Sequence, residues 1–568
     1  MKLINFRNIM LFLAVGTLAG CDFMDCDESS DYSKQEIFDS FDRSKRMVTD
    51  IYSYLPHDFG KIAGTSTEAT STSDADLTTD AMLDAATDDA IHVYKSSAIW
   101  RFVDGTWSAN RLVDDVWSFY YQAIRAANLY LKESEGQDFK DWEYSDRYKD
   151  MIKDFTNYRY EVRFLRAFYY FELIKRYHNV PFVLDVLTLD EANAVKPSSF
   201  EQIAKFIVDE CSDLATLLPV NYQGFVDKET GRVTRGAAMA LKSRVTLYMA
   251  SPLFAANDDA KWKAAASAAY ELIAANTYKL DKFSNLFSAA NNKSVEVILA
   301  RPTGEHGDFE KANFPMGVEG GKTSTCPTQN LVDAFEMKDG SAFDWNDPTK
   351  VANMYYDENG KETRDPRLYK TVICNDMTYM NTTINTYEGS RFGAPIEGAT
   401  MTGYYLRKGL NETVSLDPTN TIKKPHHYPT FRYAEILLDY AEAMNEWKGP
   451  NDKANLSLTA NEALNQVRIA ANMPAVSIND KGEFRTKVRN ERRVELAFED
   501  HRFWDIRRWK IGDVVKEIYG VKIQKQGDTY KYTKQVVQTR IWNDKMYLYP
   551  IPQKEVYLND NLTQNPGW

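Results

Sequence analysis

The segment from residue 144 to 177 is the feature that most limits the possible folds of this chain. Its apolar residues recur at helical spacing, and in its second half they occupy most of the helix circumference, as shown by Phe164, Leu165, Phe168, Tyr169, Phe171 and Leu173. A helix that is apolar on most sides must be covered on most sides. The sequence therefore predicts a helical assembly packed around this segment.

Helical periodicity recurs along much of the chain. We expect further helices at 31–55, 114–132, 199–217, 234–249, 260–275, 433–447, 460–471 and 486–509. Ser199 followed by Gln202 is typical of a capped helix start. Alanines gather in 234–249 and 260–275, which indicates helices that approach closely, as in tetratricopeptide pairs. No clean 34-residue period is present, so an irregular helical domain stays the alternative.

Residues 300–429 interrupt this pattern. Gly, Pro, Asn, Asp, Thr and Tyr dominate there, which predicts loops, short strands and small helices inserted between helical blocks. Long irregular segments inside a compact domain are usually functional. We therefore expect a mainly α fold with one half at 31–290, a second half at 291–568 and a ligand face formed by the insert at 300–429. The tail after residue 509 is expected to hold short strands.

The N-terminus carries an export signal at residues 1–20. A basic start with Lys2 and Arg7 precedes an apolar run at 9–18, which is too short to span a membrane. The run ends in Leu-Ala-Gly directly before Cys21, which resembles a bacterial lipobox. This resemblance implies cleavage after residue 20 and acylation of Cys21. A plain secreted protein with a chance cysteine is the alternative.

Charge and cysteine content exclude several classes of protein. The net charge is −12 and no basic stripe is present, so we expect no nucleic-acid partner. The five cysteines form no CxxC pair and no metal-ligand spacing with histidine. The glycine-rich segment 317–323 has the wrong spacing for a P-loop. We expect no cofactor and no metal site, and residues 357–360 fit a turn better than a calcium loop.

The most charge-dense segment lies at 491–508. Three glutamates repeat every four residues beside three arginines, namely Glu491, Glu495, Glu499, Arg492, Arg493 and Arg502. Interpreted as chemistry, two of the carboxylates would form a general acid/base pair. Interpreted as structure, the segment forms an arginine–carboxylate network that fixes the C-terminal helices to the scaffold. Neighbouring arginines keep carboxylates ionised, which favours the structural interpretation, and we expect no catalytic residue.

Several segments follow one another in a characteristic order. They are Arg-Phe-Leu-Arg-Ala-Phe-Tyr-Tyr at 163–170, Pro-Thr-Gln-Asn-Leu at 327–331, Asp-Pro-Arg-Leu at 365–368, Arg-Tyr-Ala-Glu-Ile at 432–436, Glu-Arg-Arg-Val-Glu-Leu at 491–496 and the terminal Gln-Asn-Pro-Gly-Trp. Together they resemble the SusD/RagB-like outer-membrane lipoproteins over nearly the whole mature chain. The resemblance implies tetratricopeptide-like helix pairs, a SusC-like TonB-dependent transporter as partner, and capture of a glycan at the cell surface.

The residues just after Cys21 support a surface location within this resemblance. Asp22, Asp25, Asp27 and Glu28 resemble the surface-export signal of such lipoproteins, and residues 21–30 would then form a flexible acidic tether. The protein would be lipid-anchored in the outer membrane and exposed outside the cell.

Candidate ligand residues are aromatic side chains in irregular sequence with polar neighbours, because sugars offer flat C–H faces and hydroxyl groups. One set comprises Asp74, Asp76, Trp100, Arg101, Trp107 and Asn110. A second set in the insert comprises Trp345, Tyr379, Tyr387 and Arg391. Simple packing is the alternative for each aromatic residue. Tyr404 and Tyr405 are expected in the core, and His426 and His427 are expected to face solvent.

Three functions remain open from the sequence. The leading one is a non-catalytic glycan-binding lipoprotein. A RagB-like protein that binds peptides for uptake is the first alternative. A surface glycoside hydrolase is the second, and it would need two carboxylates about 5–10 Å apart in a cleft.

Overall fold

The apolar segment at 144–177 forms helix α7 (Tyr148–Tyr177), the longest helix of the structure, a computed structural model that describes residues 33–57 and 81–568. Its second half is buried on nearly every side, as the all-round apolar pattern predicts. Helices α3 (Phe41–Tyr52), α6 (Trp117–Glu133) and α9 (Phe200–Leu217) pack against it. Tyr169 and Tyr170 are both 0% exposed, so their phenol rings are part of the hydrophobic core.

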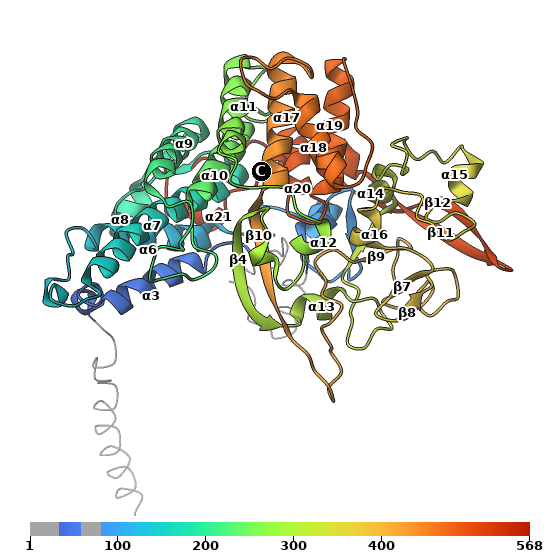
Figure 1. Ribbon diagram of the computed structural model, residues 1–568, viewed down its shortest axis with the longest axis horizontal. Coiled ribbons are helices and arrows are strands. Elements are labelled where there is room, and N and C mark those ends of the chain that lie inside the picture. Colours follow the sequence, from blue (N-terminus) through green and yellow to red (C-terminus); the bar gives the residue numbers. More distant parts are fainter. Residues whose placement is uncertain (1–32, 58–80) are drawn as a thin grey trace, which may run out of the picture.

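The helices continue from α7 as a row of packed neighbours (Figure 1). After α9 come α10 (Arg235–Ala250), α11 (Asp259–Ala274) and α17 (Tyr433–Lys448), each packed on the one before, and α18 (Ala460–Ala470) and α19 (Lys481–Glu495) pack on α17. The predicted alanines Ala265, Ala268 and Ala269 are buried where α11 meets its neighbours. The mainly α fold with close helix pairs is therefore confirmed.

Two of the predicted helices are divided. The first consists of α2 (Lys34–Phe38) and α3, and Ser40 between them caps α3 by accepting a hydrogen bond from the backbone N–H of Arg43. The last consists of α19 and α20 (Arg502–Arg508). Phe498 and Asp500 in the break both have a φ of 60°, which no α-helix accommodates. Periodicity alone continues across both breaks, so the sequence pattern did not reveal them.

Residues 300–429 hold short elements and loops, as predicted. The helices are α13 (Asp308–Asn313), α14 (Gln329–Ala334), α15 (Pro348–Ala352) and α16 (Leu368–Thr371). The strands are β5 (Thr325–Pro327), β6 (Val372–Ile373), β7 (Met377–Tyr379), β8 (Thr382–Ile384) and β9 (Tyr405–Leu406). At the border of the insert, β4 (Val297–His306) pairs antiparallel with β10 (Lys424–Arg432), and β5 pairs with β1 (Ala90–His92) from the N-terminal half.

The tail differs from the prediction of short strands. It forms a long antiparallel hairpin of β11 (Glu517–Gln526) and β12 (Thr529–Thr539), joined by a two-residue turn in which Gly527 has a φ of +62°. Ile518, Val521 and Ile523 of β11 are buried, and the last two belong to the hydrophobic core of the insert. The hairpin extends away from the helices (Figure 1). A strand that packs on a distant part of the chain can extend as far as that packing stabilises it. The local sequence therefore does not reveal how long the strand is.

Candidate ligand-binding face

The N-terminal candidate residues lie on and after the short helix α5 (Trp100–Asp104). Trp100 is half-buried, its indole Nε1 donates to the carbonyl of His92 at 3.2 Å, and Lys95 Nζ lies 5.7 Å from its ring centroid. Arg101 Nη1 donates to the carbonyl of Leu112 at 2.8 Å, and Asn110 is exposed. Asp74 and Asp76 lie outside the described residues.

Trp107 does not belong to this face, so the prediction that it stacks on a ligand is wrong. Its side chain is 1% exposed. Its ring is enclosed edge-to-face by Phe102, Tyr549 and the C-terminal Trp568 at centroid distances of 4.5, 4.9 and 4.6 Å. The tail, more than 400 residues away in sequence, folds back over this ring, and no local pattern signals that.

In the insert, Trp345 is a fixed and partly exposed aromatic residue. Its Nε1 lies 3.1 and 3.2 Å from the two carboxylate oxygens of Asp333. Asp333 in turn pairs with Lys534 on β12 at 2.8 Å and accepts from the amide of Gln329 at 2.7 Å. This chain of contacts holds the indole in one orientation.

Tyr387 and Arg391 lie further along the insert, after strand β8. Tyr387 is half-buried, 5.9 Å from the ring of Tyr530 on β12, with Lys525 Nζ 5.5 Å from its centroid. Arg391 is exposed and donates to the carbonyl of Gly317 at 2.6 Å. The hairpin β11–β12 therefore contacts the surroundings of both Trp345 and Tyr387.

The remaining aromatic and histidine residues of the insert are mostly buried. Tyr379 is 1% exposed and packs near Phe314, so its assignment as a ligand residue is wrong. Tyr404 and Tyr405 are 0% exposed, which confirms them as core. His426 is 6% exposed, and its Nε2 lies 2.8 Å from Glu310. The prediction that His426 faces solvent is therefore wrong.

The two candidate sets are connected by the segment 314–325. Tyr94, near Trp100, donates its hydroxyl to the carbonyl of Lys322 at 2.7 Å, and Arg391 donates to the carbonyl of Gly317. Residues from the N-terminal half and from the insert thus hold opposite ends of one loop.

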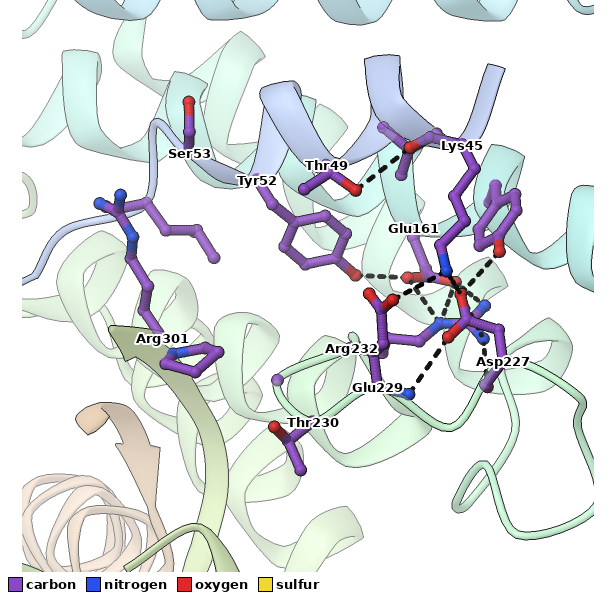
Figure 2. Close-up of a pocket in the computed structure, with 15 residues that line it drawn as sticks. Lys45, Thr49, Tyr52, Ser53, Glu161, Asp227, Glu229, Thr230, Arg232 and Arg301 are labelled. Atoms are coloured by element: carbon purple, nitrogen blue, oxygen red, sulfur yellow. Dashed lines mark hydrogen bonds and ion pairs between the residues drawn. The ribbon is translucent and has the colours of Figure 1, made fainter. Parts of the chain in front are cut away.

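Sequence reasoning missed a cavity of about 270 Å³ between α3, α7 and the segment 227–232 (Figure 2). On one wall, Lys45 Nζ lies 2.8 Å from Glu229 and 3.2 Å from Asp227. Deeper in, Glu161 accepts from the hydroxyl of Tyr52 at 2.5 Å and from Arg232 Nη2 at 2.5 Å. The contributing residues are scattered over most of the N-terminal half and form no motif.

The acidic side chains of this cavity form ion pairs with its basic side chains. Burial raises the pKa of Glu161, and the Arg232 guanidinium opposes that rise by stabilising the carboxylate. Burial and the Glu161 charge raise the pKa of Tyr52, so its hydroxyl stays a donor. Hydroxyls of Thr49, Ser53 and Thr230 and the apolar Val48, Leu55 and Pro302 complete the lining, which suits a small polar ligand with an apolar face.

A second cavity of about 440 Å³ adjoins the first across residues 229–232. Its lining combines polar side chains such as Asn221, Gln223, Asn292 and His427 with the apolar segment 297–300 of β4 and the charged Lys228, Glu229 and Arg232. Gly231 separates the two cavities with a φ of +86°, and a Cβ there would lie 2.6 Å from Pro302. Only glycine allows this segment to cross β4 so closely.

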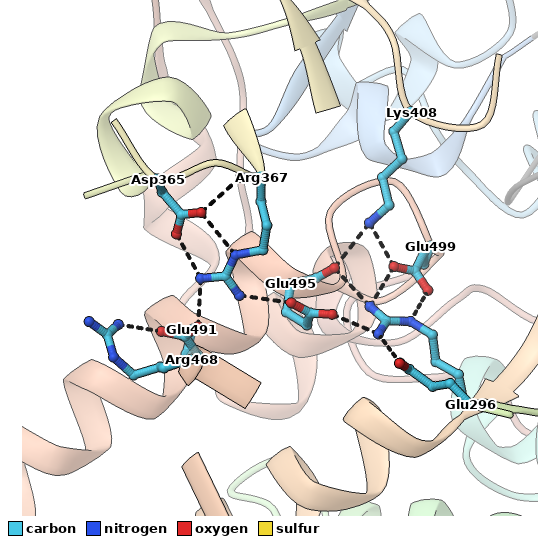
Figure 3. A network of polar contacts seen from close by, with 9 residues as sticks. Glu296, Asp365, Arg367, Lys408, Arg468, Glu491, Glu495 and Glu499 are labelled. Atoms are coloured by element: carbon cyan, nitrogen blue, oxygen red, sulfur yellow. Dashed lines mark hydrogen bonds and ion pairs between the residues drawn. The ribbon is translucent and has the colours of Figure 1, made fainter. Parts of the chain in front are cut away.

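The glutamates predicted to form a structural network do so at the junction between α19, the insert and β10 (Figure 3). Arg367 contacts Glu491 at 2.6 Å and Glu495 at 2.7 Å. Arg432 contacts Glu495 at 2.7 Å and Glu499 at 2.6 Å. Lys408, Arg468 and Glu296 extend the network with ion pairs of 2.6, 2.6 and 2.8 Å.

This network is buried and does not fit acid/base catalysis. Burial would raise the pKa of Glu495, but Arg432 and Arg367 outweigh it and lower the pKa to about 2. A general acid needs a pKa near the working pH, and Glu495 is far from it. The structural interpretation of the segment is confirmed.

The described residues offer no evident metal centre. Among them, no group of three or more His, Cys, Asp or Glu side chains is placed to hold an ion. Asp357 accepts from the backbone N–H groups of Asn359 and Lys361 at 2.8 and 2.9 Å, which confirms the predicted turn. Within the same part of the chain, no helix is both long and apolar enough to cross a bilayer.

Comparisons with known proteins give a consistent result. The SusD family model matches residues 286–568, and a model described as starch-binding associating with outer membrane matches residues 22–247. SusD-like protein P38 of Formosa agariphila is 25% identical over 442 residues, which cover 71% of this chain and 74% of the relative.

Solved structures agree over almost the full length. A SusD-like protein from Bacteroides fragilis has a TM-score of 0.76 at 25% identity, covering 94% of this chain and 99% of its own. A SusD-like carbohydrate binding protein from the same organism has a TM-score of 0.73 at 25% identity, covering 93% and 100%. A laminarin binding SusD-like protein, at 20% identity, 93% and 99% coverage and a TM-score of 0.62, shares the fold. The chain belongs to the SusD/RagB-like family.

Proposed function

We propose that this protein captures a glycan at the cell surface and passes it to a SusC-like TonB-dependent transporter in the outer membrane. Family membership supports the binding role, since one relative of the same fold at 25% identity is described as a carbohydrate binding protein. The match to a model of starch-binding proteins associated with the outer membrane supports the location. Acylation of Cys21 would provide the anchor.

The fixed orientation of Trp345 is the structural observation that best supports this proposal. An indole held through Asp333 and Lys534, yet partly exposed, needs no reordering before a sugar ring stacks on it. Preorganised aromatic platforms increase affinity because the entropy of ordering them is already lost. Tyr387, Arg391, Trp100, Arg101 and Asn110 would add stacking and hydrogen bonds around the ligand, and Asp74 and Asp76 stay candidates.

The role is binding without catalysis. The most concentrated carboxylates, in the network around Arg432, are buried and paired with arginines, so they are not available to a sugar. A relative described as carbohydrate binding points the same way. Release of reducing sugar from a bound glycan would contradict this part of the proposal and favour the hydrolase alternative.

A glycan array followed by calorimetry tests the proposal. Trp345→Ala should weaken binding of the best glycan at least tenfold, because truncating a central aromatic contact costs about 2 kcal/mol or more. Trp447→Ala is the matched control, since Trp447 is also half-buried but lies on α17 of the scaffold. Binding of a peptide pool without any glycan would instead favour the RagB-like alternative.

The transporter partner is tested separately. Mild-detergent purification of the native protein should recover an outer-membrane barrel in near-equal amount. Recovery of the protein alone, with normal ligand uptake in a deletion strain, would contradict the role in import.

A further inference from the structure

Trp142 and Tyr144 form an exposed aromatic pair outside the candidate ligand face. They lie in the loop 134–147 between α6 and α7 and are 53% and 94% exposed. No other tryptophan of the described residues reaches the exposure of Trp142. Large aromatic side chains with this much free surface mark contact sites, because leaving them in water is unfavourable.

The base of this loop is fixed. Phe139 is 6% exposed and packs edge-to-face on Phe41 and Phe155, with ring centroids 6.0 and 4.8 Å apart. The backbone N–H of Trp142 donates to the carbonyl of Phe139 at 2.8 Å, and the hydroxyl of Tyr148 donates to the carbonyl of Asp138 at 2.7 Å. The aromatic pair is therefore presented to solvent by an anchored loop.

The same end of the molecule holds the beginning of the described chain. Lys34, one residue after Ser33, forms an ion pair of 2.7 Å with Glu133, the last residue of α6 and the start of the loop region. Helices α3, α6 and α7 meet at this end, far from the β11–β12 hairpin (Figure 1). The aromatic pair is thus close to the point that the N-terminal segment must reach.

The chain length between Cys21 and this end is short. Ser33 follows Cys21 by twelve positions, which span about 40 Å at most even when fully extended. If Cys21 carries the lipid, as proposed above, this end of the protein stays within that distance of the bilayer. A tether of this length raises the effective concentration of the loop at the membrane to about the millimolar range, so a weak contact suffices.

We propose that Trp142 and Tyr144 rest in the headgroup layer of the membrane that holds the lipid anchor. Trp and Tyr are enriched at membrane interfaces because each has an apolar ring and a polar group. Among the described exposed residues of 135–150, four are acidic and three are basic: Glu135, Glu143, Asp146 and Asp150 against Lys140, Arg147 and Lys149. The loop should therefore prefer zwitterionic over anionic phospholipids, and the contact would set the tilt of the body on the surface.

Quenching of tryptophan fluorescence by brominated lipid tests this inference. The full-length lipoprotein is reconstituted into phosphatidylcholine vesicles with or without bromine on the acyl carbons nearest the headgroup. The wild-type protein should lose up to about one eleventh of its emission, because one of its 11 tryptophans reaches the lipid. Trp142→Phe should abolish the difference, and the control Trp447→Phe should retain it. Phosphatidylglycerol vesicles should give less quenching.

The outcomes separate this inference from the proposed anchorage on which it rests. A protein that does not sediment with vesicles at all is not lipidated, and both the anchor and this contact fail. A protein that sediments but shows the same quenching with and without Trp142→Phe is anchored, and only this contact fails. If Trp142→Ser with Tyr144→Ser weakens glycan binding or transporter recovery and quenching is absent, the pair contacts those partners and the membrane assignment is overturned.

Discussion

The helical scaffold and the loop-rich insert each have their own hydrophobic core, and the two are assembled differently. The scaffold core consists mainly of side chains spaced three or four residues apart on long helices such as α7, α10 and α17. The insert core joins residues far apart in sequence, for instance Phe314, Tyr369, Tyr404, Val494 and Val521. Periodicity therefore indicates burial in the scaffold, whereas burial in the insert depends on distant partners.

Two tryptophans show the consequence. Trp107 and Trp345 both lie in irregular sequence with polar neighbours, and they looked alike as ligand residues. Trp107 is enclosed by Tyr549 and Trp568 of the tail, while Trp345 is held at the surface by Asp333. In irregular segments, the same local sequence pattern occurs around a buried aromatic residue and around one that is accessible to a ligand.

The network around Arg432 joins the two regions. Glu491, Glu495 and Glu499 come from α19 and the residues after it, and Glu296 directly precedes β4. Arg367 and Lys408 come from the insert. We expect this junction to contribute more to the stability of the protein than any surface ion pair.

Arg432→Met should be the most destabilising change. It leaves Glu296, Glu495 and Glu499 buried without their shared cation, and breaking a buried pair costs about 3–5 kcal/mol. Denaturant unfolding measures this loss. Lys205→Met is the control, because Lys205 is 70% exposed and pairs with Asp209 at the surface, where a pair contributes about 1 kcal/mol or less. Equal effects of the two variants would show that the junction is not special.

Trp107→Ala should lower the free energy of unfolding by about 3–5 kcal/mol, because it opens a cavity among Phe102, Tyr549 and Trp568. Glycan affinity of the folded protein should stay unchanged. Lost affinity at normal stability would return Trp107 to the ligand face.

The buried Asp500 should make stability depend on pH. Burial raises its pKa to about 6, so the folded state binds the proton more tightly than the unfolded state, where the pKa is about 3.9. Its favourable contribution is complete below about pH 4 and is lost as the pH rises through about 6. Relative to wild type, Asp500→Asn should gain up to about 3 kcal/mol between pH 4 and pH 7.

Asparagine suits this test because it tolerates the left-handed backbone at residue 500, where φ is 60°. The stability of wild type and variant is compared by denaturant unfolding at several pH values. A difference that does not change with pH would show that Asp500 stays ionised in the folded protein.

Tyr387→Ala should have the smallest effect on folding and a clear effect on binding. Tyr387 is half-buried beside Tyr530, so its loss should weaken glycan binding by about 1–2 kcal/mol while the unfolding free energy changes little. Tyr270→Ala on α11 of the scaffold is the matched control. The reverse result, lost stability with normal binding, would place Tyr387 in the insert core.

Local sequence patterns were sufficient to predict the helical scaffold. Helices α6, α7, α9, α10, α11, α17 and α18 lie within a few residues of their predicted positions, because hydrophobic periodicity and caps such as Ser199 act over one or two turns. The structural role of Glu491, Glu495 and Glu499 was also predicted, but their partners were not. The neighbouring arginines Arg492, Arg493 and Arg502 pair with aspartates instead. The cations that hold the glutamates come from distant segments: Arg367, Arg432, Arg468 and Lys408. The family follows from the ordered motifs.

Three features depend instead on contacts between distant segments: the burial of aromatic residues in the irregular segments, the length of the tail hairpin and the positions of the cavities. Trp107, Tyr379 and His426 are covered by segments far away in the chain, and the cavity wall pairs Lys45 with Asp227 and Glu161 with Arg232. Such contacts form only when distant segments meet, so their energy is a property of the assembled fold, and no window of local sequence contains it.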